Sequence, residues 1–159
     1  MFHKVQRSVL FVSVLAGVSA LGIAAPAAAT EVDAPKQSRV IHGSMPAVCY
    51  SVPKTTTVSD GVPGPVFWKR LQCMGSMASH HPYTGPIDGD LAVNSWTGVQ
   101  SRLDVGNYYQ WNWITGKNDS ISVKALQRWA HANGHRLPVN GEWSGATYSA
   151  VADCLNRHW

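Results

Sequence analysis

The stretch YTGPIDGDLAVNSWTGVQ, residues 83–100, has a counterpart later in the chain, RLPVNGEWSGATYSAVA, residues 136–152. Both contain a proline, a β-branched residue, Asp or Asn, and a glycine in direct succession. Each then continues to a Ser or Thr, an aromatic residue and a valine at the same spacing. The recurrence of this pattern predicts an internal structural repeat, and such a repeat would determine the fold.

The residues around the second stretch predict two helices. Residues 119–134 open with capping residues, place apolar side chains at helical spacing and stop at a glycine. The sequence LPVNGEW then predicts a tight turn, because Asn140 and Gly141 tolerate positive φ. A second helix is expected after Gly145, with Thr147 as its N-cap.

The first stretch has the same layout. One helix is predicted over VFWKRLQCMGSMA, residues 66–78, and another over NSWTGVQSRL, residues 94–103, capped by Asn94 or Ser95. The turn GPIDG lies between them. One such unit is too small to bury a core by itself. We therefore expect an all-α fold in which two tandem helix–Asp/Asn-Gly turn–helix repeats pack as one small domain.

The repeated residues resemble a known family, the small helical peptidoglycan-binding domain, with its pattern V-x-x-L-Q and then D-G-x-aromatic-G-x-x-T-x-x-A-V. The first copy keeps Leu71, Gln72, Asp88, Gly89, Ser95 and Val99. The second keeps Val123, Leu126, Gln127, Gly141, Trp143, Thr147, Ala150 and Val151. The chain departs from the pattern at Leu91, Ala92, Asn140 and Ser144. The resemblance implies three-helix units, and tandem copies of this kind are found in secreted proteins of high-GC Gram-positive bacteria.

The chain is expected to have five parts. Residues 1–29 read as a secretory signal peptide, because two basic residues precede an apolar run and the small residues APAAAT. A membrane anchor is the alternative, but the run is shorter than the roughly 20 residues that span a bilayer. Residues 30–65 form a Pro/Ser/Thr-rich segment or linker, so the compact part is expected to start near Val66. Repeats over residues 66–103 and 121–159 are joined by an aromatic connector, residues 104–120.

Charge and cysteine content limit the function classes. Without Lys4 and Arg7, 11 basic side chains remain beside 9 acidic ones, and they form no cluster of the kind that nucleic-acid binding needs. In an oxidising compartment we expect a disulfide between Cys73 and Cys154, with Cys49–Cys73 and Cys49–Cys154 as open alternatives. The cysteines have no C-x-x-C spacing, so metal ligation is not expected.

Two groups of side chains are candidates for ligand binding. Asp88 and Asn140 brace the turns through backbone hydrogen bonds or contact a muropeptide amide. Three aromatic residues, Trp96, Trp143 and Tyr148, are expected to line a groove beside the turns. In the connector, Tyr109, Trp111 and Trp113 alternate with amides as on one face of an extended strand, where they either stack on sugar rings or cover the seam between the repeats.

Catalytic motifs are incomplete. The stretch SHHPYTGPID partly matches the pattern of zinc D-Ala-D-Ala peptidases through His81 and Asp88, but Thr84 and Pro86 replace its glycine and alanine. No G-x-S-x-G elbow or glycine-rich phosphate loop occurs. Asp90 and Glu142 occupy the same position in the two copies, which is typical of solvated turn residues rather than of the carboxylate pair of a glycosidase.

The expectation is a secreted, non-enzymatic protein, extracellular or associated with the cell wall, that binds peptidoglycan or another wall glycan without a cofactor. One alternative is an interaction module that binds or regulates a secreted hydrolase. A less favoured alternative is a zinc-dependent wall peptidase that uses His81 and Asp88. No contact with nucleic acid is expected, nor any with a membrane after the signal is cleaved.

Overall fold

The computed structural model describes residues 44–55 and 62–158, and the regular elements of these residues are helices. The α-helices are α1 (Pro65–Ser76), α2 (Val93–Val105), α3 (Ser120–Ala132) and α4 (Gly145–His158). Two 3-10 helices, η1 (Ala47–Ser51) and η2 (Trp111–Trp113), complete the elements of this part of the chain, which contains no strand. The all-α prediction is therefore confirmed. The predicted signal peptide lies outside the described residues, and none of the helices within them is long and apolar enough to cross a membrane.

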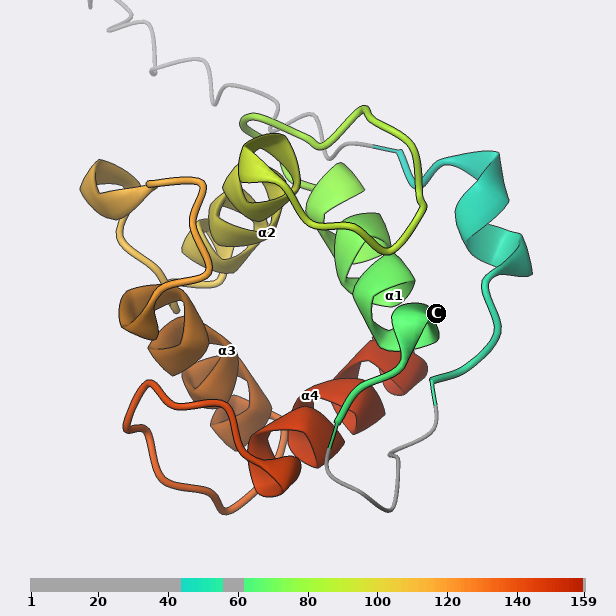
Figure 1. The fold of residues 1–159 in the computed structure, drawn as a ribbon. Coiled ribbons are helices and arrows are strands. Elements are labelled where there is room, and N and C mark those ends of the chain that lie inside the picture. Colours follow the sequence, from blue (N-terminus) through green and yellow to red (C-terminus); the bar gives the residue numbers. More distant parts are fainter. Residues whose placement is uncertain (1–43, 56–61, 159) are drawn as a thin grey trace, which may run out of the picture. The chain divides into compact units, whose positions relative to one another are not determined.

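The four helices share one hydrophobic core. Each helix packs on the next in chain order, and α1 also contacts α4 (Figure 1). The core takes Leu71 from α1, Val99 from α2, Leu126 from α3 and Val151 from α4, all fully buried. These are apolar positions of the helical pattern, so the 3.6-residue periodicity identifies the core-facing side of each helix.

The helix starts follow local rules, with two differences from expectation. Asp119 is the N-cap of α3, and its side chain accepts a hydrogen bond from the Ser122 N–H at 2.9 Å. By contrast, the N-cap of α2 is Ala92, whose methyl group cannot accept a hydrogen bond, and the two expected caps, Asn94 and Ser95, both lie inside the helix. Thr147 likewise lies within α4, where its own N–H donates to the Ser144 hydroxyl at 3.2 Å.

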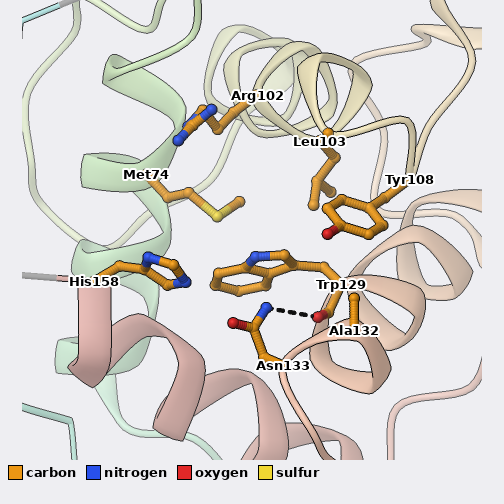
Figure 2. Close-up of a pocket in the computed structure, with 9 residues that line it drawn as sticks. Met74, Arg102, Leu103, Tyr108, Trp129, Ala132, Asn133 and His158 are labelled. Carbon is orange, nitrogen blue, oxygen red and sulfur yellow. Dashed lines mark hydrogen bonds between the residues drawn. The ribbon is translucent and has the colours of Figure 1, made fainter.

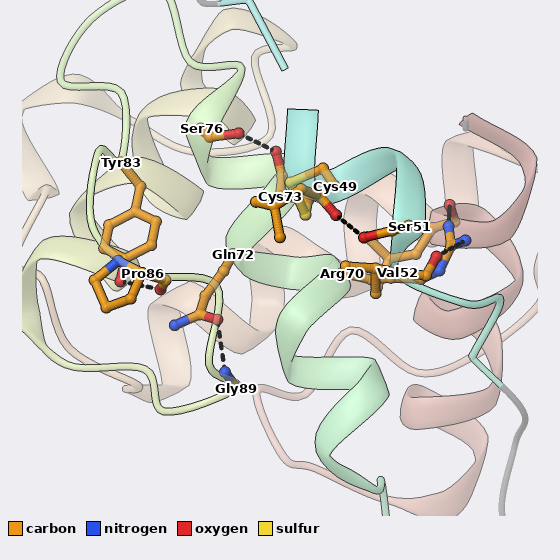
Figure 3. Close-up of a disulfide and its surroundings, with 12 residues drawn as sticks. Cys49, Ser51, Val52, Arg70, Gln72, Cys73, Ser76, Tyr83, Pro86 and Gly89 are labelled. Atoms are coloured by element: carbon orange, nitrogen blue, oxygen red, sulfur yellow. Dashed lines mark hydrogen bonds between the residues drawn. A yellow bond between two sulfur atoms is a disulfide. The ribbon is translucent and has the colours of Figure 1, made fainter. Parts of the chain in front are cut away.

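The disulfide joins Cys49 to Cys73, with 5.8 Å between the Cα atoms (Figure 3). Among the described cysteines, Cys154 is a buried free thiol. The expected Cys73–Cys154 pair is wrong. Cys73 lies on the side of α1 that packs against η1, in a small cluster with Cys49 and Val52. Cys154 belongs to the main core instead. Both cysteines are buried, but in different clusters.

The folded part begins earlier than the expected start near Val66. Residues 44–55, which we call the N-terminal strap, pack on α1 through the disulfide and on α4 through hydrogen bonds. The guanidinium of Arg70 donates to the carbonyl oxygens of Val52, Pro53 and Leu155. Thr55 and the side chain of Asn156 exchange two hydrogen bonds, of 2.9 and 2.7 Å. The strap therefore ties the first helix to the last one.

Candidate binding site

A buried glutamine of α1 holds the turn that follows it. Nε2 of Gln72 donates to Oδ1 of Asp88 and to the carbonyl oxygen of Asp90, both at 2.9 Å. Oε1 of Gln72 accepts from the Gly89 N–H at 2.8 Å. Gly89 has φ of 89°, a conformation that side-chain-bearing residues rarely adopt. The side chain of Asp88, although exposed, is therefore occupied in bracing the turn.

The turn after α3 is held by the same set of bonds. Nε2 of Gln127 donates to Oδ1 of Asn140 at 2.9 Å and to the carbonyl oxygen of Glu142 at 3.0 Å, and Oε1 accepts from the Gly141 N–H at 2.9 Å. Here an amide oxygen takes the place of a carboxylate oxygen. Both acceptors serve because the glutamine presents an N–H group to them.

A related arrangement follows α2, within the segment that the sequence assigns to the connector. Oε1 of Gln100 accepts from the N–H groups of Thr115 and Gly116 at 2.9 and 2.8 Å, and its Nε2 donates to the Lys117 carbonyl oxygen at 3.0 Å. Gly116 also has positive φ. The signal was present in the sequence as a helix glutamine followed by a glycine, but the missing Asp or Asn concealed it.

The hydrogen bonds at the first turn change its electrostatics. The bond from the Gln72 side chain, followed by that from the Asp90 N–H, lowers the pKa of Asp88 below its usual value. At Asp119, partial burial acts to raise the pKa, but the bonds from Ser122 and Thr115 together outweigh it, and the pKa is lowered. Both carboxylates are therefore more stable in their charged form than in an unfolded chain.

Four aromatic rings pack together: Phe67 and Trp68 of α1, Trp143 of the turn before α4, and Tyr148 of α4. The rings of Trp143 and Tyr148 stack with centroids 4.5 Å apart and planes 7° apart. Trp68 meets Trp143 edge-on at 5.7 Å, and Phe67 lies in edge contact with these rings. The indole N–H of Trp143 donates to Oδ1 of Asn118 at 2.9 Å. This hydrogen bond connects the aromatic cluster to Asn118, in the segment before α3.

A pocket of about 280 Å³ lies beside the first turn, and we call it the turn pocket. Its lining residues are Trp68, Gly89, Asp90, Leu91, Trp96 and Asn118. The pocket thus brings the predicted Trp96 and the Asp-Gly turn together with Trp68 and Asn118, which the sequence analysis did not select. Trp68 and Asn118 lie outside the repeated pattern of the turns, and only the packing of the helices places them here.

The connector aromatics do not form the expected extended face. Residues Trp111–Trp113 are a 3-10 helix, and Tyr109 is only 4% exposed with its hydroxyl bonded to the Trp113 carbonyl oxygen at 2.7 Å. Trp111 and Trp113 are about half exposed, at 46% and 47%. Trp111 stacks on His81, with centroids 5.2 Å apart. Tyr109 therefore belongs to the core, and only the two tryptophans remain open to solvent.

Over residues 44–55 and 62–158, no three His, Cys, Asp or Glu side chains lie close enough to hold a metal ion.

Comparisons with known proteins add no relative. No protein-family model, no curated protein and no solved structure matches this chain. Its function is therefore inferred from its own residues.

Proposed function

We propose that this protein is a secreted, non-catalytic module that binds cell-wall peptidoglycan, and that the turn pocket is the binding site. The observation that carries the proposal is one concave site in which the partly buried indole of Trp68 lies beside the polar groups of Asp90 and Asn118. Trp96 also lines this site, but it is only 4% exposed and belongs to the core, so it supports the pocket from behind. Saccharides have an apolar ring face and a polar rim, so one accessible indole surface beside hydrogen-bonding groups suits them. The volume of the pocket suits one sugar ring or a few atoms of a stem peptide.

We also infer that the chain is built from repeated helix–turn units. The support is the recurrence of a buried helix glutamine that bonds the backbone of a glycine turn, after α1 and after α3, with a variant after α2. The sequence resemblance to peptidoglycan-binding domains rests on these same glutamine and glycine positions. The Cys49–Cys73 disulfide supports an oxidising compartment, in agreement with secretion.

The lining of the turn pocket favours binding over hydrolysis. Of its six lining residues, Asp90 alone carries a carboxylate, whereas glycoside hydrolysis uses a pair across the bond. The neighbouring Asp88 is already bonded to Gln72 and to the Asp90 N–H. Neither carboxylate is paired with a histidine by a hydrogen bond or ion pair that would make it a general acid or base.

The test is co-sedimentation of the mature chain, residues 30–159, with purified peptidoglycan sacculi at about 0.15 M and 0.5 M salt. We expect pelleting at both salt concentrations without release of sugars or peptides. Asn118→Ala removes a polar group of the pocket and the partner of the Trp143 indole, so it should weaken binding by about tenfold.

Glu142→Ala provides the matched control for Asp90→Ala, because both residues follow the glycine of their turn and both are exposed. Only Asp90→Ala should weaken pelleting. Absence of pelleting at both salt concentrations would overturn the wall-binding proposal and direct the search to a protein partner. Released fragments would identify an enzyme instead.

A further inference from the structure

A second pocket, of about 270 Å³, lies where the C-terminal parts of the four helices meet, and we call it the helix-end pocket. Met74 comes from α1, Leu103 from α2, Trp129 from α3 and His158 from α4 (Figure 2). It shares no lining residue with the turn pocket, whose side chains come from the N-terminal parts of α1 and α2 and from the adjoining loops. Nothing in the proposed wall binding uses it.

The floor of the helix-end pocket is apolar and flat. Trp129 is 8% exposed, and the ring of His158 stacks on it with centroids 5.6 Å apart and planes 28° apart. Met74 and Leu103 are buried beside it. Such a floor accommodates an aromatic ring or a compact aliphatic group.

Three side chains that line this pocket carry hydrogen-bond donors with no partner in the described part of the chain. The indole N–H of Trp129 makes no hydrogen bond there, although its side chain is more than nine-tenths buried. In Figure 2 this N–H lies on the ring edge turned toward Met74, and the hydroxyl of Tyr108 points in toward Trp129. The Tyr108 hydroxyl and the Arg102 guanidinium also have no hydrogen bond or ion pair to described residues. These donors line the pocket with no acceptor of the described chain bonded to them, so the complement of this pocket is an acceptor.

The negative ends of the helix dipoles do not cancel the preference of this pocket for a hydrogen-bond acceptor. Helix C-termini carry partial negative charge, which by itself disfavours an anion. Here the exposed carbonyl groups already accept bonds, since Leu103 O receives the N–H groups of Gly106 and Tyr108, and Trp129 O receives those of Asn133. Arg102 then adds a full positive charge at the rim, and a planar guanidinium matches a carboxylate with two parallel bonds.

We propose that the helix-end pocket binds a small apolar carboxylate, with its ring or aliphatic body on Trp129 and its carboxylate bonded to Arg102, Tyr108 or the Trp129 indole N–H. A free organic acid and the C-terminus of a peptide that ends in an apolar residue both present this chemistry.

The test is isothermal titration of the mature chain with 3-phenylpropionate and, as the matched neutral probe, 3-phenylpropionamide. We expect the acid to bind at millimolar or lower concentration and the amide to bind about tenfold more weakly. A tripeptide ending in phenylalanine, with a free or an amidated C-terminus, distinguishes the two sources of the ligand. Tighter binding of the free-ended peptide than of the acid assigns the site to peptide ends, and the reverse assigns it to small acids.

Two substitutions locate the binding. Arg102→Met keeps the aliphatic stem and removes the charge, and Trp129→Phe keeps a flat ring and removes the donor. Each substitution should weaken binding of the acid by about tenfold. For Arg102→Met, binding of the amide should change by less than about threefold. Arg136→Ala, an exposed arginine outside the pocket, is the control and should have no effect.

The proposal is overturned if the acid and the amide bind equally, if Arg102→Met binds the acid as well as the unaltered chain does, or if no probe binds up to about 10 mM. Circular dichroism of each variant confirms that it is folded. Arg102→Met changes a half-exposed side chain, so it tests the site even if Trp129→Phe reduces stability.

Discussion

The buried carboxamide of Gln127 donates to the exposed side chain of Asn140 at 2.9 Å, and it also bonds the backbone N–H of Gly141 and the carbonyl oxygen of Glu142. Gln72 and Asp88 stand in the same relationship at the first turn. A core residue thus fixes the conformation of an exposed loop. Because the acceptor oxygen belongs to a carboxylate in the first turn and to an amide in the second, each turn provides a control for the other.

Gln127→Ala should destabilise the fold by about 2 to 4 kcal/mol. The substitution removes a fully buried side chain and leaves the Gly141 N–H without its acceptor. Urea unfolding followed by circular dichroism measures the change. Gln110→Ala, at an exposed glutamine, should remain within about 0.5 kcal/mol. Equal effects of the two substitutions would show that the turn bonds contribute nothing.

Asp88→Asn should reduce the acid sensitivity of the fold. The folded state lowers the pKa of Asp88, so this carboxylate stabilises the fold above its usual pKa, and that contribution is lost as the pH falls through the lowered value. The difference in unfolding free energy between the unaltered chain and Asp88→Asn should therefore shrink below about pH 4.

The measurement for Asp88→Asn is urea unfolding at several pH values between about 2.5 and 7. At neutral pH the variant should remain folded, because Asn140 shows that an amide fits the same bonds. Asp119, whose pKa is also lowered, should keep part of the acid sensitivity in both chains. A difference that stays constant across this range would contradict the role of the Asp88 carboxylate.

Gly141→Ala should cost more stability than Gly134→Ala, although both glycines have positive φ, at 85° and 94°. A Cβ atom on Gly141 would lie 2.7 Å from the carbonyl oxygen of Ser120, whereas a Cβ on Gly134 would meet nothing within 4 Å. We expect about 1 to 2 kcal/mol for Gly134, from backbone strain alone, and about 3 kcal/mol or more for Gly141. Thermal unfolding of the two variants at equal protein concentration distinguishes backbone strain, which both share, from the steric clash with Ser120, which only Gly141→Ala would introduce. Equal losses would mean that the turn moves to make room.

Replacing Cys49 and Cys73 together by alanine should destabilise the chain by about 3 kcal/mol, because the disulfide closes a loop of 24 residues. Urea unfolding of this double variant measures the change.

In the native chain, Cys154 should react with a thiol reagent only after denaturation, and it should be the one site that reacts. Burial raises the pKa of Cys154 to about 11, so its thiol is protonated and shielded at neutral pH. Rapid labelling of the native chain, or a peptide map that joins Cys73 to Cys154, would refute the observed pairing.

The helices were predictable because their apolar spacing is a local property. Leu71, Val99, Leu126 and Val151 are core residues by pattern alone, and all four are buried. The caps were less predictable, since Ser95 and Thr147 are cap-type residues that lie inside their helices. Their hydroxyl-bearing side chains are buried there by packing, which no local rule reports.

Long-range features escaped the sequence for a physical reason. The alternation of Tyr109, Trp111 and Trp113 suggested a strand, but a short 3-10 helix with one buried ring produces the same spacing. The choice of disulfide partner depended on which side of α1 carries Cys73, and the strap that supplies Cys49 has no periodicity. Of the residues that line the turn pocket, the sequence pointed to the turn and to Trp96 but not to Trp68 and Asn118.

The two hydrogen bonds between Thr55 and Asn156 have a consequence for engineering and for evolution. They hold the last residue of the N-terminal strap, which precedes the four α-helices in the chain, beside the C-terminal part of α4. A region whose entry and exit points are neighbours can be spliced into a surface loop of a host protein, or permuted by joining its ends and opening a turn, with little distortion. The bonds of the strap thus make the four helices a unit that suits insertion into another protein or circular permutation.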